Sequence, residues 1–182
     1  MLTNTHKKFL NPKTVLFQAG LKSGEVVADL GTGSGFYSLA AAEIVGGNGQ
    51  VHAADVKDSA LDHLAAEARL KGMKVIRTYH CDLDEEELAC KVPEGECDMV
   101  VMANIMHEVE SRKNLIKHGY GMLKTGGRLL IVDWNGQPGP IGPQSEKRIS
   151  EGETRKLLES SSFKFIKNIE TDEYHFGMVF ER

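Results

Sequence analysis

Two carboxylates and three glycines are the residues whose types and spacing could do chemistry together in this sequence. Asp29 lies near the end of an apolar run and precedes glycines at positions 31, 33 and 35, and Asp55 ends a second apolar run. Alternate glycines let the backbone turn sharply out of a strand and approach a ligand closely. A carboxylate at the end of the next strand can accept two hydrogen bonds from ribose hydroxyls. The pattern predicts a β-α-β unit that binds an adenosine-bearing cofactor.

The spacing of the glycines distinguishes between cofactors. Dinucleotide-binding loops read Gly-x-Gly-x-x-Gly and hold a pyrophosphate, whereas this loop reads Gly-x-Gly-x-Gly. The carboxylate of Asp29, just before the loop, would repel a phosphate and suits an ammonium group. A nicotinamide-dependent dehydrogenase is therefore the least favoured class of enzyme for this chain.

Two segments carry a resemblance to a known family. The segment Asp29–Gly35 resembles the first motif of class I S-adenosylmethionine-dependent methyltransferases. The segment Ala103–Glu110 is similar to the fourth motif in the small, single-domain branch that resembles the quinone-biosynthesis methyltransferases. It differs from the (Asp/Asn/Ser)-Pro-Pro-aromatic tetrapeptide with which methylases of nucleic acids and glutamine hold a planar amine. The resemblance covers nearly the whole chain and implies S-adenosyl-L-methionine as the cofactor.

The resemblance also implies roles for residues at several strand ends. In this family the glycine loop wraps the methionine moiety and the acidic residue after the second strand holds the ribose. Asp82 would accept a hydrogen bond from the adenine amine, with Leu83 against the ring. The full set of cofactor-binding residues that we expect is Asp29, Gly31, Thr32, Gly33, Ser34, Gly35, Tyr37, Asp55, Val56, Cys81, Asp82, Leu83, Ala103 and Asn104.

Alternating strand and helix patterns must position these residues. The resemblance implies an α/β fold: a Rossmann-like, doubly wound, seven-stranded and mostly parallel sheet of order 3-2-1-4-5-7-6, with the last strand antiparallel and helices on both faces. We expect one methyltransferase domain over residues 1–182, with an N-terminal helical segment at 1–22. The predicted strands lie at about residues 25–30, 50–55, 74–79, 97–102, 128–133, 163–170 and 174–180, and the predicted helices after them at about 35–45, 58–72, 111–123 and 150–161.

Local signals mark several element boundaries. Asn11 followed by Pro12 indicates a helix start, Asp58 or Ser59 is a candidate cap, and Ser150 with Glu153 predicts a capping box. The acidic run at residues 84–87 is interpreted as a first helical turn, and Gly119 and Gly121 as an interruption of a helix. Residues 124–127 are expected to turn into the fifth strand.

The methyl acceptor should bind beyond the carboxyl ends of the strands, near the switch in strand order. The segment after the fourth strand, an irregular loop at residues 134–149 and the final hairpin turn should meet there. Methyl transfer is an in-line displacement, and an oxygen, nitrogen or carbon acceptor also needs a base. His107 is the candidate catalytic base, with a helix-capping role as the alternative. The candidate acceptor-binding residues are Trp134, Arg148, Tyr174 and His175.

Composition limits the other possibilities. The 182 residues carry a net charge of −4, which offers no basic surface for nucleic acid, so we expect a small-molecule acceptor. No membrane span and no signal peptide are recognisable, which predicts a cytoplasmic protein. We expect a monomer or a homodimer, and the sequence does not distinguish the two. The odd number of cysteines, without Cys-x-x-Cys spacing, predicts reduced thiols at Cys81, Cys90 and Cys97.

Two rival functions stay open. A divalent-metal-dependent O-methyltransferase could use Asp133 and Asn135, but Asn104 stands where such enzymes need a carboxylate, so we expect no metal. A catalytically inactive, cofactor-binding regulatory subunit is the second rival. The sequence names neither the acceptor nor its acceptor atom.

Overall fold

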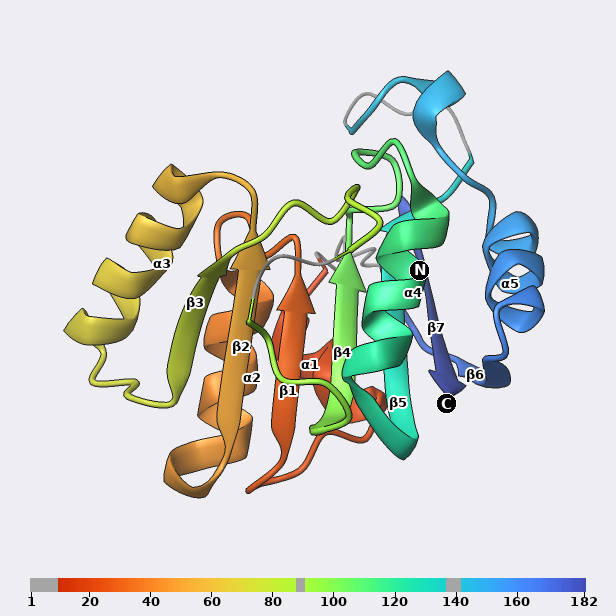
Figure 1. The fold of residues 1–182 in the computed structure, drawn as a ribbon. Helices are drawn as coiled ribbons and strands as arrows, with labels where there is room; N and C mark the ends of the chain where they lie inside the picture. Colours follow the sequence, from red (N-terminus) through yellow and green to blue (C-terminus); the bar gives the residue numbers. More distant parts are fainter. Residues whose placement is uncertain (1–9, 88–90, 137–141) are drawn as a thin grey trace, which may run out of the picture.

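A single twisted sheet organises the chain in the computed structural model (Figure 1). The structure describes residues 10–87, 91–136 and 142–182. The strand order is β3-β2-β1-β4-β5-β7-β6, in which β7 is antiparallel to both of its neighbours and the first five strands are parallel. This confirms the predicted fold. The strands are β1 Val26–Leu30, β2 Gln50–Asp55, β3 Ile76–His80, β4 Cys97–Ala103, β5 Leu123–Trp134, β6 Lys164–Asn168 and β7 His175–Glu181.

Helices cover both faces of this sheet. In Figure 1, α4 lies in front of the strands and α1 and α2 lie behind them. Local signals start two helices: the Asn11 side chain accepts the Thr14 N–H ahead of Pro12, and Ser150 and Glu153 form the predicted capping box. The helices are α1 Pro12–Gln18, α2 Phe36–Val45, α3 Asp58–Leu70, α4 Arg112–Met122 and α5 Glu151–Ser160, with short 3-10 turns at Gly46–Asn48 and Ser145–Lys147.

The strand β4 shows why the central sequences are continuously apolar. Val100 and Met102 pack into the core cluster that contains Leu115 of α4, whereas Met99 and Val101 pack into the cluster that contains residues of α1 and α2. Successive side chains of a strand point to opposite faces, and both faces of this sheet are covered. The helices thus bury the faces and leave the carboxyl ends of the strands for a site.

Two predicted helix signals at polar residues are wrong. The N-cap of α3 is Lys57 rather than Asp58 or Ser59, and the Asp58 carboxylate lies 2.7 Å from Nδ1 of His80 instead. Residues 84–87 form bends rather than a helical turn. Asp84 accepts the N–H of Ser111, the N-cap of α4, at 2.6 Å. Asp58 and Asp84 thus both interact with residues that are distant in the sequence rather than with the start of a helix formed by their own segment.

Two glycine interpretations also need correction. The helix α4 runs without interruption through Gly119 and Gly121. A Cβ at Gly119 would lie 2.3 Å from Cε of Met102, so glycine here permits a close approach of α4 to β4 rather than a break. The strand β5 begins at Leu123, and a register irregularity opposite Cys97 and Met99 contains the residues expected to turn.

The two cysteines that the structure describes differ in their bonding. Cys81 is disulfide-bonded, so the prediction of a reduced thiol is wrong there. Pairing depends on the distance between two Cβ atoms, which sequence spacing does not report. Cys97 has a free thiol that is fully buried, and burial raises its pKa to about 12. Cys90 lies outside the described residues.

Within the described ranges, none of the helices has both the length and the apolar composition needed to cross a membrane.

Candidate active site

The glycine loop follows β1 at the point where the strand order reverses between β1 and β4. Gly31, Gly33 and Gly35 have φ values of +74°, +50° and +78°, a region that other residues rarely adopt. A Cβ at Gly31 would lie 2.5 Å from Cδ1 of Ile105, and a Cβ at Gly35 would lie 2.6 Å from Cδ1 of Leu64. The loop therefore needs glycine for both its turn and its close approach to neighbouring side chains.

Asp29 ties this loop to the start of α2. Its Oδ2 atom accepts hydrogen bonds from the hydroxyls of Thr32 at 2.9 Å and Ser38 at 2.6 Å. The side chain is almost completely buried, and this desolvation raises its pKa although the two hydroxyls oppose the shift. Asp29 thus organises the loop, and its contact with an ammonium group remains a prediction.

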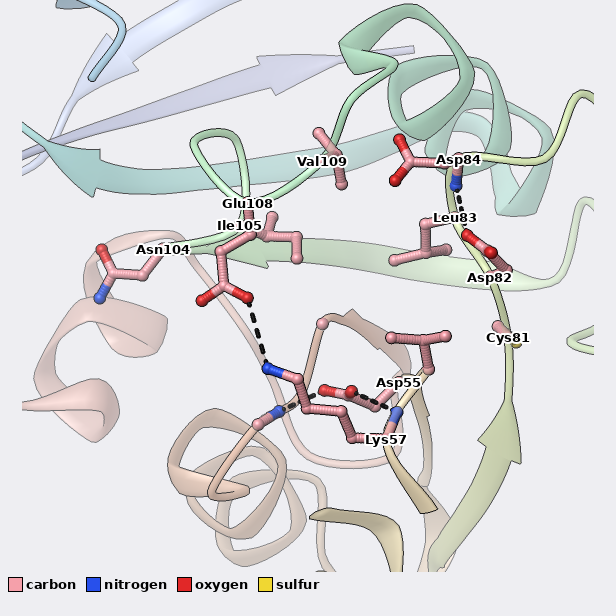
Figure 2. A pocket seen from close by; sticks show the side chains of 13 residues that line it. Asp55, Lys57, Cys81, Asp82, Leu83, Asp84, Asn104, Ile105, Glu108 and Val109 are labelled. Atoms are coloured by element: carbon pink, nitrogen blue, oxygen red, sulfur yellow. Dashed lines mark hydrogen bonds and ion pairs between the residues drawn. The ribbon is translucent and has the colours of Figure 1, made fainter. Parts of the chain in front are cut away.

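Asp55 joins the glycine loop to the end of β2 (Figure 2). Its Oδ2 atom accepts the Gly33 N–H at 2.8 Å, and its Oδ1 atom accepts the Lys57 N–H at 2.9 Å. Each carboxylate oxygen has two lone pairs, so both can accept a further hydrogen bond. The carboxylate is held by backbone on both sides in an orientation that suits a ribose diol.

Two adjoining pockets open at the carboxyl ends of the strands. They share Gly31, Gly33, Asn104 and Glu108. The first extends toward the end of β3, and Figure 2 shows Asp55, Asp82 and Leu83 around it. The second extends toward α1 and the start of α2. Every predicted cofactor residue except Gly35 lines one of the two: the first has Gly31, Gly33, Asp55, Val56, Cys81, Asp82, Leu83 and Asn104, and the second adds Asp29, Thr32, Ser34, Tyr37 and Ala103.

Sequence reasoning missed several residues that line these pockets. Glu108 lines both, and its Oε2 atom lies 3.7 Å from Nζ of Lys57 on the opposite wall (Figure 2). Glu108 directly follows His107 in the segment that resembles the fourth motif, and this position was the sequence signal that could have identified it. The other missed residues are Lys57, Asp84, Ile105 and Val109 in the first pocket and Leu10, Asn11, Pro12 and Phe36 in the second.

Two polar atoms in these walls are buried without a hydrogen-bond partner among the described residues. They are Oδ1 of Asn104 and the hydroxyl of Tyr37. Asn104 also has a φ of +55°, which is uncommon for any residue other than glycine. A strained backbone and an unsatisfied buried oxygen are features that cluster at functional sites, and the cofactor-binding role of Asn104 remains a prediction. Burial raises the pKa of Tyr37, so its hydroxyl stays protonated.

His107, the candidate base, lies behind the pocket walls. In the part of the chain that the structure describes, it lines neither pocket. Its Nδ1 atom is 3.2 Å from Oδ1 of the fully buried Asp133, and its Nε2 atom is 3.9 Å from Oε1 of Glu108. Its role as a base remains a prediction.

The residues predicted to bind the acceptor form a cluster of their own. The rings of Trp134 and His175 lie 4.2 Å apart, and the Arg148 guanidinium lies 5.5 Å from the Trp134 ring. The Tyr174 N–H donates to Asp172, whose carboxylate also lies 2.7 Å from Nδ1 of His175. As far as the structure describes the chain, none of Trp134, Arg148, Tyr174 and His175 lines either pocket, and their acceptor role stays a prediction.

The loop at residues 134–149 is described only at its two ends. Arg148 donates to the carbonyl of Pro143 at 3.0 Å and to that of Asn135 at 3.3 Å, and Arg112 donates to the carbonyl of Lys147. Arg148 thus joins the described ends of the loop to each other, and the Arg112 bond attaches the second end to α4. The central residues 137–141 lie outside the description.

The described residues hold no group of three or more His, Cys, Asp or Glu side chains that could bind a metal ion.

The sheet order, the glycine loop and the Asp55 carboxylate together define the class I S-adenosylmethionine-dependent methyltransferase fold. Residues 21–175 match a family model described as a methyltransferase domain, and the chain belongs to this family.

Similar proteins include enzymes named for quinone methylation. The chain is 29% identical over 118 residues to the ubiquinone/menaquinone biosynthesis C-methyltransferase UbiE of Psychromonas ingrahamii, and this match covers 64% of this chain and 45% of the relative. It is 33% identical over 119 residues to the chloroplastic 2-phytyl-1,4-beta-naphthoquinone methyltransferase of Arabidopsis thaliana, covering 64% and 44%. The chain thus spans less than half the length of these relatives. The crystal structure of a SAM dependent methyltransferase from Aquifex aeolicus superimposes with a TM-score of 0.86 at 27% identity, covering 94% of this chain and 89% of that one.

Replacing Asp55 by alanine should weaken binding of S-adenosylhomocysteine, the demethylated cofactor. Loss of charge-assisted hydrogen bonds to the ribose should cost about 1 to 3 kcal/mol, which is roughly a 5- to 150-fold higher dissociation constant. Calorimetry measures the dissociation constant. Asp58→Ala is the control, because Asp58 is a nearby carboxylate that is absent from both pocket linings. An unchanged dissociation constant in Asp55→Ala would place the ribose elsewhere.

Proposed function

We propose that this chain transfers a methyl group from S-adenosylmethionine to a small-molecule acceptor without a metal ion. The observation that carries the proposal is the pair of adjoining pockets that meet at Gly31 and Asn104. Adenosine fits the first pocket, between Asp55 and Leu83. The methionine moiety and the acceptor fit the second, beside Asp29 and Tyr37.

The residues present suit this cofactor. Gly31 lines both pockets without a side chain that would displace Ile105, and the pocket-lining residues Asn104 and Tyr37 carry buried oxygens that have no hydrogen-bond partner among the described residues. When bound, the cofactor supplies an electrophilic methyl group on a sulfonium. The chain's own contribution is to align the acceptor with that group and to exclude water, which accounts for much of the rate of such displacements.

The second pocket favours an acceptor with an apolar body. Its wall includes Leu10, Pro12, Phe36 and Ala103, and among its described lining residues the charged side chains are the carboxylates of Asp29 and Glu108. Carboxylates would repel a phosphate or carboxylate on the acceptor. Two relatives are named for quinone methylation, so hydroxylated naphthoquinones and reduced benzoquinones are the first compounds to test.

Mass spectrometry of a small-metabolite extract tests the proposal. The extract is incubated with the protein and cofactor carrying a trideuterated methyl group, and an acceptor should gain that label. The control omits the protein. A complete absence of labelled product from the extract and from the quinone panel would contradict the proposed activity and favour a regulatory, cofactor-binding role.

Calorimetry tests the cofactor separately. We expect S-adenosylmethionine and S-adenosylhomocysteine to bind and NAD to give no heat of binding, because the carboxylate of Asp29 lies where a pyrophosphate would have to approach. Tight binding of NAD with no response to the sulfonium cofactor would overturn the cofactor assignment.

A further inference from the structure

Three side chains connect the pockets with the interior of the sheet. Glu108 lines both pockets and its side chain is 54% exposed, whereas the side chain of His107 is 10% exposed and that of Asp133 is fully buried. Oε1 of Glu108 lies 3.9 Å from Nε2 of His107, and Nδ1 of His107 lies 3.2 Å from Oδ1 of Asp133. The imidazole therefore lies between a carboxylate in the pocket and a carboxylate in the core.

Asp133 favours the form of His107 that carries its hydrogen on Nδ1. Its Oδ2 atom accepts the Met106 N–H at 3.0 Å, and its Oδ1 atom accepts the Trp134 N–H at 2.8 Å. Held by these two donors, Oδ1 presents an acceptor to Nδ1 of His107. A neutral imidazole has one N–H, so a hydrogen on Nδ1 leaves the lone pair of Nε2 directed toward Glu108.

Two other charged side chains lie close to the connected residues Asp133, His107 and Glu108. Nζ of Lys57 lies 3.7 Å from Oε2 of Glu108 and comes from the segment after β2. Arg112 of α4 donates from Nε to the carbonyl of Met106, next to His107. Lys57 and His107 therefore approach different oxygens of Glu108, Oε2 and Oε1 respectively.

We propose that Glu108 is the catalytic residue that takes a proton from the methyl acceptor, and that His107 and Asp133 are its positioning residues. The proposal rests on the methyltransferase function proposed above. The bond between the acceptor atom and its hydrogen breaks and the proton goes to a Glu108 oxygen. An electron pair on the acceptor atom forms the new bond to the methyl carbon while the bond between that carbon and sulfur breaks, and S-adenosylhomocysteine leaves with the electron pair on its sulfur. Nε2 of His107 can then accept that proton through Glu108. His107 thus acts on the acceptor through its neighbour, since the imidazole itself lies outside both pocket linings.

The first test is nitrogen-15 NMR of the histidine rings in the complex with S-adenosylhomocysteine, with His107 assigned from the spectrum of His107→Gln. We expect His107 to carry its hydrogen on Nδ1. In Asp133→Ala the acceptor for Nδ1 is lost, so the share of the form with its hydrogen on Nδ1 should fall. A ring that carries the hydrogen on Nε2 in the unaltered protein, or an unchanged distribution of the hydrogen in Asp133→Ala, would overturn the positioning roles.

The second test is the rate of S-adenosylhomocysteine formation with the metabolite extract as the probe. Removing a general base typically costs 100-fold or more, so Glu108→Gln should lower turnover by about 100-fold. Its dissociation constant for S-adenosylhomocysteine should stay within about threefold, and His107 should keep its Nδ1 hydrogen. Turnover within threefold of the unaltered protein would overturn the assignment of Glu108. If the unaltered protein forms no product, the methyltransferase proposal itself fails, and with it the catalytic role of Glu108.

Asp58→Asn is the matched control. The Asp58 carboxylate lies 2.7 Å from Nδ1 of His80, in a pair of the same kind that is exposed and belongs to neither pocket. This variant should leave turnover and the His107 spectrum unchanged. A fall in turnover similar to that of Glu108→Gln would show that the effect is not specific to the chain of Asp133, His107 and Glu108, and would contradict the proposal.

Discussion

Replacing Gly31 by valine should weaken cofactor binding by roughly 5- to 150-fold. A Cβ would lie 2.5 Å from Cδ1 of Ile105, and displacing a packed side chain costs about 1 to 3 kcal/mol, where each 1.4 kcal/mol is a factor of about 10 in affinity. The φ of +74° is also strained for a β-branched residue, and this strain lowers the stability of the fold. Gly31 and Ile105 both line the first pocket, so the displaced atoms would enter the space for the cofactor. Calorimetry with S-adenosylhomocysteine measures the loss.

Gly24→Val separates the strain of the backbone from the loss of the pocket. Gly24 has a φ of +83°, no described atom lies within 4 Å of a Cβ built there, and it is absent from both pocket linings. The control should lower thermal stability but leave the dissociation constant within about threefold. Equal affinities of Gly31→Val and the unaltered protein would show that the cofactor does not use this loop.

Replacing Gly119 by leucine should destabilise the fold by about 3 kcal/mol. Its Cβ would lie 2.3 Å from Cε of Met102 and 3.5 Å from Cγ1 of Val100, and both of these side chains are fully buried. The end of the Met102 side chain would have to move within a packed core, and overpacking of this kind costs about 1 to 3 kcal/mol or occasionally more. Thermal unfolding should show a melting temperature lower by roughly 6 to 12 °C.

Gly121→Leu is the control for this change because it introduces the same side chain into the same helix. No described atom lies within 4 Å of a Cβ at Gly121. The substitution should keep or raise the melting temperature, since glycine is a poor helix former by about 0.8 kcal/mol or more. Equal melting temperatures for the two variants would contradict the close contact of α4 with β4.

Short stretches of sequence determined the frame of the site. The apolar runs, the glycine loop after β1 and the caps at Asn11 and Ser150 each depend on residues a few positions apart. The glycine loop and Asp55 were assigned to one site from the strand and glycine pattern, and the resemblance to the methyltransferase family implied that Asp82 belongs to the same site. All of them line the two adjoining pockets.

Only the tertiary structure decided which side chains meet across different elements. The pairing of His107 with Asp133, the place of Glu108 between two pockets and the disulfide at Cys81 depend on distances between chain segments that no local pattern reports. Gly119 shows the same limit. A glycine in a helical pattern predicts an interruption of the helix, but the structure shows that its missing side chain leaves room for Met102 of the neighbouring strand. Local periodicity records the neighbours of a residue along the chain, whereas contacts in a packed core depend on register and on the distance between elements.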